Sequence, residues 1–281
     1  MCIRDRYTIE QYYKIYQRNA LPYRQFKQDD SSLSSKEQII FNSNKYRVMT
    51  HQGWANIKRL IRHKCEKEMF KIYTTTGSII VTGDHSLLLD SSSIIQIKPN
   101  DLSVNEHNLL HCKDTSFITN NLIYQKEEWN LSYEQKNGYI IFDESLEDKY
   151  VSYLFYTFRK KFPTCCFDFL IDYDESTQTE NQKYVIDLKN RRNRQNGLLL
   201  KKISLGKTTS YVYDIETSNG TFMAGTGSLI VKNTDSIYCS FPMYKDPQQV
   251  WDNAKNVEKQ IVDAKLFMDP MKLLFEEKVC I

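Results

Sequence analysis

Cysteine and histidine are the side chains here most able to bind a metal ion or act as nucleophile or acid. The seven cysteines lie at positions 2, 65, 112, 165, 166, 239 and 280. Their number is odd, the only close pair is adjacent, and no Cys-x-x-Cys spacing occurs. This pattern argues against a disulfide framework or a zinc site and favours a reducing, intracellular compartment, cytoplasm or nucleus. We interpret Cys165 and Cys166 as core residues rather than a redox pair.

The histidines show one spacing of chemical interest, a Thr-x-x-His formed by Thr82 and His85 directly after a strand-like run. The other four histidines lack the spacing of metal ligands, and we interpret them as structural or exposed; they are His51, His63, His107 and His111. A lone histidine after a strand is most often a surface or satisfied core residue. His85 therefore gains a chemical role only in combination with other residues.

The elements that must position these residues read mainly as β-strands. Residues 7–18 have helical spacing of aromatic and aliphatic residues, and residues 24–45 form a polar, Ser-rich loop. Strand-like runs separated by turn signals follow at 46–49, 57–61, 69–74, 78–82, 94–97 and 109–111. Because these runs do not alternate with helices, the pattern predicts an all-β domain.

The second half of the chain changes character twice. Residues 113–150 are weakly patterned and read as an insertion or linker, and residues 151–161 read as helical or buried. Strand-like runs return at 184–188, 198–203, 211–216 and 228–231. Beyond Asn233 we expect a strand, an amphipathic helix and a second strand, at 236–241, 246–267 and 275–279. This pattern predicts that two different proteins are joined at the 233/234 bond.

The amino-acid composition excludes few further classes of function. The chain has 281 residues and a formal net charge of +3, with 26% charged residues, a balance too even to predict nucleic-acid binding. No apolar run approaches the ~20 residues that a membrane span needs, so no membrane partner is expected.

Two segments resemble the Hint-fold blocks of inteins, which are protein-splicing domains. They are YTTTGSIIVTGDHSLLL at 73–89 and YVYDIETSNGTFMAGTGSLIVKN at 211–233. The resemblance implies a mainly β Hint domain split in sequence, with residues 7–112 and 151–233 as its two parts. Residues 113–150 are then a linker or an endonuclease remnant.

The resemblance also implies a self-excision reaction that needs no cofactor. A Cys or Ser at the intein start attacks the preceding carbonyl, while His85 protonates the departing nitrogen and Thr82 orients the junction. Asp214 then shuttles a proton between the first nucleophile and the branched intermediate. The hydroxyl of Thr234 accepts the upstream flanking segment by transesterification.

The last implied step belongs to Asn233. Its side-chain amide attacks its own carbonyl carbon, forming a succinimide and cutting the 233–234 bond, and Lys232 polarises the scissile carbonyl. Taken singly, these residues also fit ordinary roles: Thr82 in a strand, Asp214 facing solvent or capping a turn, Asn233 in a turn. Only the joint pattern favours splicing.

Residues 234–281 resemble a fragment of the palm of family B DNA polymerases. Thr-Asp-Ser-Ile-Tyr at 234–238 matches the second part of the Tyr-Gly-Asp-Thr-Asp-Ser motif, and 269–279 matches a later palm segment. The resemblance implies that excision rejoins a Mg²⁺ site in which Asp235 is a ligand. The expected partners are therefore the flanking extein segments and, through the spliced enzyme, DNA and dNTPs. The fragment alone lacks most of the polymerase, so we expect no polymerase activity from it.

The chain departs from the intein pattern at three places. The usual opening block with a Cys or Ser is not found, and residues 1–6 resemble translated sequencing adapter, so we expect the true start to be missing. Lys232 stands where the family usually has histidine. Gly220 and Thr221 precede Phe222, where the family usually has a histidine before the phenylalanine. Slow or lost splicing is therefore expected.

Two further functions stay open. No Gly-Asp-Gly or Ala-Asp-Gly helix pair of a homing endonuclease occurs between 112 and 200, which favours a mini-intein, and an acidic cluster at 172–175 fits a solvated loop. One alternative is a splicing-inactive relic in a polymerase gene. The other is a DNA-binding or endonuclease-derived module that uses the basic stretch KNRRNR at 189–194, which a charged loop also explains.

Overall fold

The computed structural model describes residues 9–22, 37–42, 45–113, 131–174, 179–207 and 211–233, together with single residues between 253 and 263. The chain divides into two compact units, Met1–Tyr23 with Ser34–Thr234 and Arg24–Leu33 with Asp235–Ile281. In the second unit, the described residues between 253 and 263 are helical. All other described elements belong to the first unit, which is mainly β as predicted.

The longest strand of the first unit, β4 (Gly53–Lys64), organises its first sheet. This sheet has the order β1-β2-β4-β14, and β3 also pairs with β4; the other strands are β1 (Leu21–Pro22), β2 (Glu37–Ile40), β3 (Arg47–Thr50) and β14 (Tyr211–Thr217). Helix α1 (Ile9–Tyr16) and the 3-10 turn η1 (Gln17–Asn19) precede it. Tyr13 of α1 is fully buried, donates a hydrogen bond to Glu37 at 2.8 Å and lies under the Arg62 guanidinium.

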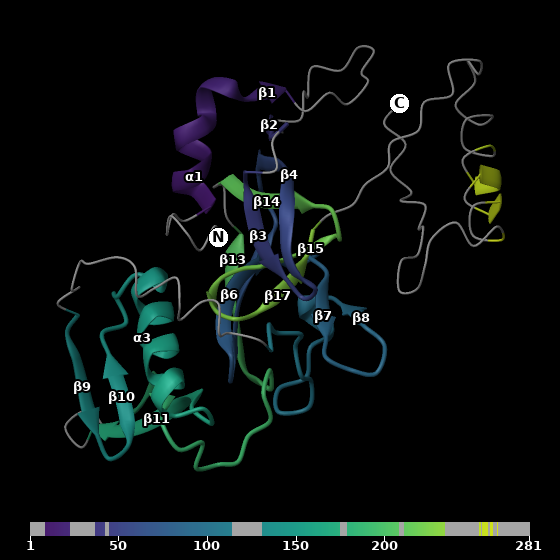
Figure 1. Ribbon diagram of the computed structural model, residues 1–281. Helices are drawn as coiled ribbons and strands as arrows, with labels where there is room; N and C mark the ends of the chain where they lie inside the picture. The colour runs from purple at the N-terminus through teal and green to yellow at the C-terminus, as the bar shows by residue number, and fades with distance from the viewer. Residues whose placement is uncertain are drawn as a thin grey trace. The chain divides into compact units, whose positions relative to one another are not determined.

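Two further sheets each combine strands from the two ends of the sequence. One has the order β13-β5-β6-β16, with β13 (Leu199–Lys207), β5 (Glu68–Thr74), β6 (Gly77–Thr82) and β16 (Thr226–Gly227). The other has the order β15-β17-β7-β8, with β15 (Thr221–Met223), β17 (Ile230–Lys232), β7 (Leu87–Leu89) and β8 (Ile95–Ile97), the last followed by the 3-10 turn η2 (Pro99–Asp101). Leu60 of β4, Ile72 of β5 and Leu199 of β13, all fully buried, belong to one hydrophobic core with Leu87 of β7, so this core joins all three sheets. This interleaving brings residues near 85 and 233 into one sheet (Figure 1).

A fourth sheet carries the long helix of the unit, and we call this part the α3 subdomain (residues 133–187). Its order is β11-β12-β10-β9, with β11 (Cys166–Asp174), β12 (Thr179–Asp187), β10 (Tyr139–Phe142), β9 (Tyr133–Lys136) and helix α3 (Asp148–Lys161). Phe155 of α3 stacks on Phe167 of β11, whose ring stacks in turn on Tyr184 of β12. The subdomain lies at the lower left of Figure 1.

The α3 subdomain corrects the expected linker. Residues 133–142 form the hairpin β9–β10, because Tyr139 and Ile140 pair with Asp187 and Ile186 of a strand some fifty residues later in the chain. The boundary expected at 150/151 therefore runs through the middle of the subdomain. Whether the subdomain is an endonuclease remnant stays a prediction.

The buried cysteines behave as core residues. Cys65, Cys112, Cys165 and Cys166 are free thiols, and the last two are each 1% exposed. Burial raises the pKa of both adjacent thiols to about 12, which makes them poor nucleophiles. The interpretation of this pair as core packing is confirmed.

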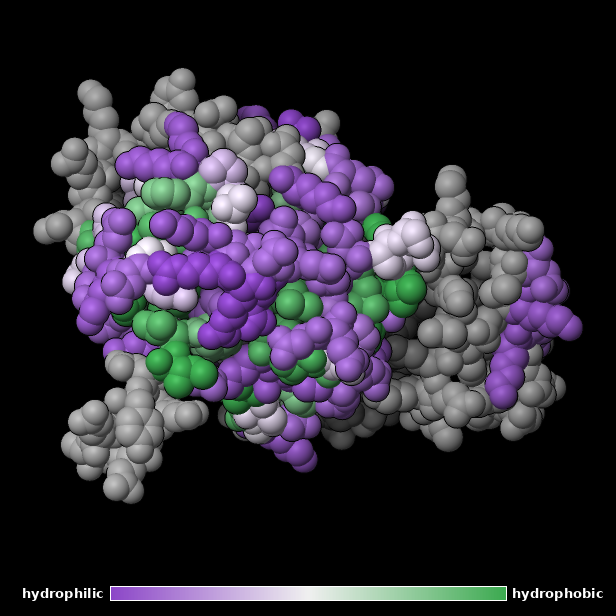
Figure 2. Space-filling view, turned by 90° about the horizontal axis from the view of Figure 1, so that it is seen from below, coloured by the Kyte–Doolittle hydropathy of each residue, from purple (hydrophilic) through white to green (hydrophobic). Residues whose placement is uncertain are grey.

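One face of the molecule is mostly polar. Figure 2 shows a face on which hydrophilic residues predominate and hydrophobic areas lie between them. No helix among the described residues is long and apolar enough to cross a membrane.

Candidate functional site

Asn233 directly follows β17, the strand that lies between β15 and β7 in its sheet. The residue is only 2% exposed, and neither its Oδ1 nor its Nδ2 has a hydrogen-bond partner among the described residues. Its backbone N–H donates to the Gly220 carbonyl at 3.0 Å, which fixes the main chain. Leaving a buried amide unpaired costs about 1–3 kcal/mol, so its presence points to a use for the free amide.

His85 lies just before β7, the strand that neighbours β17 on the side away from β15. Its backbone N–H donates to the Thr82 carbonyl at 3.0 Å, closing a tight turn between β6 and β7. Val231 of β17 lies opposite Leu87 of β7, and continuing this antiparallel register by two residues places His85 opposite Asn233. The Nε2 atom of His85 is shielded from solvent and has no hydrogen-bond partner among the described residues.

The surroundings of His85 set its charge. Burial is the main cause that lowers the pKa of its imidazole below the ordinary 6.5. The negative charges of Asp214 and Asp84 act in the opposite direction, and Lys98 adds to the lowering. At neutral pH the imidazole is therefore neutral, so it can accept a proton and then pass it on.

Thr82 and the residues beside it hold the turn. Burial acts to raise the pKa of the Asp84 carboxyl, but hydrogen bonds from Lys67 and Thr82 outweigh it and keep the pKa below its ordinary value. Lys98 donates to the Asp84 carbonyl at 2.5 Å and to the Ser86 hydroxyl at 3.1 Å. The hydroxyl of Thr82 therefore bonds within its own turn; the role predicted for it at the upstream junction is not tested.

Asp214 lies in the middle of β14, opposite Ile61 of β4. Its Oδ1 accepts a hydrogen bond from the N–H of Ile215 at 2.8 Å, which orients the carboxylate. Its charge acts on His85, so two strands far apart in sequence supply an imidazole and a carboxylate to one region. The structure thus brings His85 and Asp214 into one region, and the pairing of β7 with β17 places Asn233 in the same sheet as the strand that follows His85.

Lys232, the last residue of β17, lies directly opposite Thr221 of β15. The Thr221 hydroxyl is 2.8 Å from Nδ1 of His51, a residue interpreted above as structural or exposed. No sequence signal predicts this contact, because 170 residues separate the two partners and neither lies in a recognisable spacing. His51 is the residue near the site that sequence reasoning missed.

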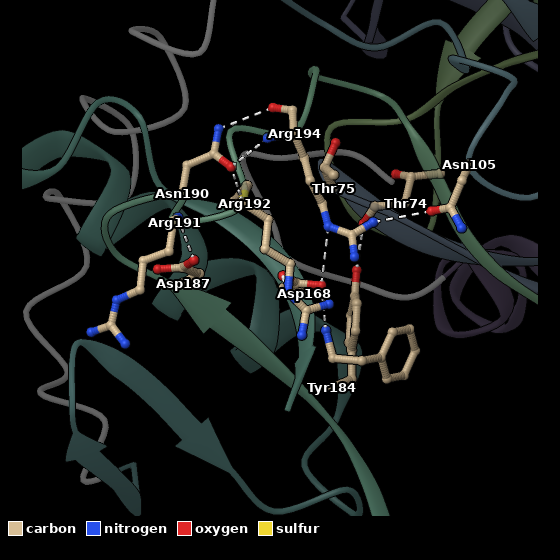
Figure 3. A network of polar contacts seen from close by, with 12 residues as sticks. Thr74, Thr75, Asn105, Asp168, Tyr184, Asp187, Asn190, Arg191, Arg192 and Arg194 are labelled. Atoms are coloured by element: carbon tan, nitrogen blue, oxygen red, sulfur yellow. Dashed lines mark hydrogen bonds and ion pairs between the residues drawn. The ribbon is translucent and has the colours of Figure 1, made fainter. Parts of the chain in front are cut away.

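The basic stretch 189–194 is used inside the chain. Arg192 and Arg194 form ion pairs with the buried carboxylate of Asp168 at 3.5 and 3.4 Å. Arg194 also donates to Asn105 at 3.1 Å, and Arg191 donates to a backbone carbonyl at residue 137. Figure 3 shows Arg192 and Arg194 reaching toward Asp168, whereas the side chain of Arg191 points away from them. Arginines of the basic stretch therefore have partners within the chain.

Comparisons with known proteins fall into three kinds. No family model matches the chain. In sequence, the chain is 26% identical over 332 aligned positions to a DNA polymerase of Acanthamoeba polyphaga mimivirus, with 78% of this chain aligned. The chain spans only 19% of that relative's length. Because the aligned stretch is longer than the chain's 281 residues, the relative has residues there without a counterpart here.

Among solved structures, the chain is similar to a mini-intein from transcription factor IIB, named Mvu in its description, with a TM-score of 0.38 and 14% identity. It is also similar to an intein from a hyperthermophile, with a TM-score of 0.37 and 9% identity. Each match covers 81% of this chain, and 90% and 88% of the respective structures. The matches are inteins and a DNA polymerase.

Two of the predicted site residues, Thr234 and Asp235, lie outside the described residues, as do the strands expected at 236–241 and 275–279. The acidic cluster is described only in its backbone, with positions 172–174 in β11. Within the described residues, no group of three His, Cys, Asp or Glu side chains is placed to hold a metal ion. The Mg²⁺ ligand expected at Asp235 is therefore not tested.

Proposed function

We propose that the segment ending at Asn233 is an intein that excises itself from a family B DNA polymerase, whose sequence resumes at Thr234. The observation that carries the proposal is the amide of Asn233, which is buried at the end of β17 and has no hydrogen-bond partner among the described residues. His85, whose shielded Nε2 has no partner among those residues either, lies just before β7, the strand that pairs with β17. Buried polar groups are normally hydrogen-bonded, so the amide of Asn233 and the Nε2 of His85 fit a site that rearranges its own backbone.

The C-terminal step follows from this geometry. The Nδ2 of Asn233 forms a bond to its own carbonyl carbon while the bond from that carbon to the nitrogen of residue 234 breaks. One proton leaves Nδ2 and one joins the departing amine, so the step is balanced without a co-reactant. The hydrogen bond from the Asn233 N–H to Gly220 fixes the backbone on one side of the attack.

The earlier steps use the remaining residues. His85, neutral at neutral pH, takes up the proton released by the attacking nucleophile and delivers it to the nitrogen freed at the upstream junction, with Thr82 shaping the turn that carries it. Asp214 shuttles a proton between the first nucleophile and the branched intermediate, and the Thr234 hydroxyl receives the upstream extein. Lys232 supplies positive charge beside the scissile carbonyl. The reaction occurs once per chain and uses no cofactor.

The host and setting are part of the same proposal. After excision Asp235 joins a Mg²⁺ site of the polymerase, which acts on DNA and dNTPs in a reducing cytoplasm or nucleus. The sequence similarity to a polymerase that spans far more than this chain supports the host assignment. That the relative carries additional residues within the aligned stretch supports a shortened intein here.

The test is the intact mass of the purified chain over several days, with and without added thiol. Cyclisation predicts a fragment of residues 1–233 that is one water lighter than a hydrolysis product, together with free 234–281. Asn233→Ala is expected to abolish both fragments, whereas the control Asn100→Ala, at an exposed position of η2, retains them.

A splicing-inactive relic is the second candidate, and the departures at Lys232 and Thr221 favour it. It predicts a chain that stays intact under every condition above while folding normally. The third reading, a DNA-binding module, predicts salt-dependent DNA affinity for the first unit. The pairing of Arg192 and Arg194 with Asp168 argues against it.

A further inference from the structure

One lysine side chain holds both chain neighbours of His85. Nζ of Lys98 donates to the Asp84 carbonyl at 2.5 Å and to the Ser86 hydroxyl at 3.1 Å. The Asp84 carbonyl belongs to the peptide bond that joins Asp84 to His85, so the first contact fixes the main chain directly at the histidine. The ammonium group therefore bridges the residues on either side of His85.

The pairing of β7 with β8 places Lys98 at this turn. Leu87 lies opposite Ile97, and continuing the antiparallel register by one residue places Ser86 opposite Lys98. Directly opposed residues of an antiparallel pair bring their side chains close together on one face of the sheet. The hydrogen bond from Lys98 to Ser86 agrees with this placement.

The chain after β8 gives Lys98 a fixed base. The Lys98 carbonyl accepts a hydrogen bond from the N–H of Asp101 at 3.0 Å, within η2. From β13, Nζ of Lys202 donates to three backbone carbonyls of residues 99–102, at 2.9 to 3.1 Å. Because the main chain is held, ordering the exposed Lys98 costs only the conformational entropy of its side chain.

A second lysine leaves the carbonyl of Asp84 to Lys98. The Asp84 carboxylate forms an ion pair with Lys67, next to β5, and also bonds Thr82. Lys67 thus holds the side chain of Asp84, whereas Lys98 holds its main chain. Of the two lysines, Lys98 makes the contact that bears directly on the backbone of His85.

Charge is the second way in which Lys98 acts on His85. Burial is the main cause that lowers the pKa of the imidazole, and the positive charge of Lys98 acts in the same direction. The negative charges of Asp214, from β14, and Asp84, from the turn itself, act in the opposite direction. Without Lys98 the two carboxylates would favour a protonated ring, and a protonated ring cannot accept the proton of a nucleophile.

We propose that Lys98 is a positioning residue for His85, which it holds through the Asp84 carbonyl and the Ser86 hydroxyl. The inference rests on the proposed function, in which His85 takes up the proton of the first nucleophile and delivers it to the nitrogen freed at the upstream junction. Lys98 keeps its own proton in that step and forms no covalent bond. Its two hydrogen bonds fix the histidine, and its charge keeps the ring able to accept the proton.

The experiment follows His85 by NMR in the full 281-residue chain carrying Asn233→Ala, which prevents the expected cleavage. Lys98→Met is expected to raise the pKa of the His85 imidazole. It is also expected to speed hydrogen exchange of the His85 amide, which bonds the Thr82 carbonyl, by about tenfold. Lys98→Arg keeps a charged donor and is expected to retain both values. The control Lys201→Met, which removes a lysine bonded to Gln182 at 2.8 Å, is expected to change neither.

A lysine that only supports the fold makes a different prediction. In that case Lys98→Met would speed exchange equally at the core amides of β5 and β6, and this result overturns the inference. An unchanged pKa of His85 in Lys98→Met, or a pKa in Lys98→Arg that rises as far as in Lys98→Met, also overturns it.

If Lys98→Met does not fold, Ser86→Ala decides, because it removes one of the two contacts of Lys98. Exchange of the His85 amide is then expected to be about threefold faster, and an unchanged rate overturns the inference. The intact mass of the unaltered chain tests the proposed function separately. A chain that never cleaves overturns that function whether or not His85 responds to Lys98, so the two failures are distinguishable.

Discussion

Two hairpin turns in the molecule follow one local pattern, Thr-x-x-Gly, yet serve different ends. They are Thr50–Gly53 between β3 and β4 and Thr74–Gly77 between β5 and β6. In each, the threonine hydroxyl donates to the glycine carbonyl, at 2.7 and 3.0 Å. In each it also accepts from the N–H two residues on, at 3.1 and 3.2 Å.

The difference lies in what surrounds the turns. The Thr74–Gly77 turn is completely buried, and its carbonyls accept hydrogen bonds at 2.9 Å from the Tyr184 hydroxyl and the N–H groups of Phe167 and Ser228. It is a docking point for the α3 subdomain. The Thr50–Gly53 turn is partly exposed, and its side chain His51 forms a hydrogen bond with Thr221. Local chemistry decides the shape of a turn, and the packing around it decides its use.

The largest effect is expected from adding a methyl group to each glycine. In Gly77→Ala the new Cβ meets the Thr226 backbone carbonyl, and backbone cannot move aside cheaply. We expect about 3 kcal/mol or more of lost stability, or a chain that does not fold. In Gly53→Ala the added Cβ has no atom within 4 Å, and only the positive φ of 96° opposes it, costing about 1–2 kcal/mol.

Urea unfolding of both variants in an Asn233→Ala background, which removes the expected cleavage, measures this contrast. Equal losses at the two glycines would contradict the difference in burial between the two turns.

The next effect separates stability from function. Thr74→Val and Thr50→Val each remove a buried turn hydroxyl, and each is expected to lower the free energy of unfolding by about 2 kcal/mol. Thr50→Val also removes the bond from Asn219 that fastens the turn beside the cleavage site, so cleavage is expected to slow about tenfold. Thr74→Val should leave the cleavage rate of the folded chain unchanged. Mass spectrometry at a temperature where both variants are folded distinguishes them, and parallel slowing would argue against a special role for the first turn.

Much of the fold could be predicted from the sequence. Strand-like runs between turn signals indicated β5, β6 and β14, and helical spacing indicated α1. Residues 151–161, which lie in α3, were read as helical or buried. The hairpin β9–β10 was missed, since β9 is exposed throughout and its pairing partner is distant. A strand without a buried face leaves no periodic signal.

The residues of the candidate site also divide into those that the sequence identified and those that it missed. His85, Asp214 and Asn233 were identified through motifs that are contiguous in sequence. His51 was not, because its value comes from a contact with Thr221 across 170 residues. The role of the basic stretch 189–194 was equally hidden, since Asp168 lies outside it. Sequence patterns report local periodicity and motifs, and contacts between them appear only in the structure.

A smaller effect concerns the docking of the α3 subdomain on the buried turn. Tyr184→Phe removes the hydroxyl that donates to the Thr74 carbonyl at 2.9 Å and leaves the aromatic stack with Phe167 in place. We expect about 1 kcal/mol of lost stability. Tyr133→Phe, at an exposed position of the same subdomain, is the matched control and is expected to be neutral. Thermal unfolding of both variants makes the measurement, and an unchanged midpoint for Tyr184→Phe would mean that ring stacking alone docks the subdomain.

The smallest effect is pH dependence, which the two turns should not share, because only the Thr50–Gly53 turn carries a titratable residue. Burial lowers the pKa of His51, so the unfolded chain takes up a proton at higher pH than the folded chain. The stability gained from neutral His51 is complete above the ordinary histidine pKa of 6.5 and is lost as the pH falls through the lower folded value. His85 and His111 are shifted in the same direction by burial, so the unfolding free energy is expected to fall between pH 7 and pH 5. His51→Gln should reduce the slope of the unfolding free energy against pH without removing it, whereas Thr75→Ser in the buried turn should leave that slope unchanged. An unaltered slope for His51→Gln would show that the His51 imidazole has the same pKa in the folded and the unfolded chain.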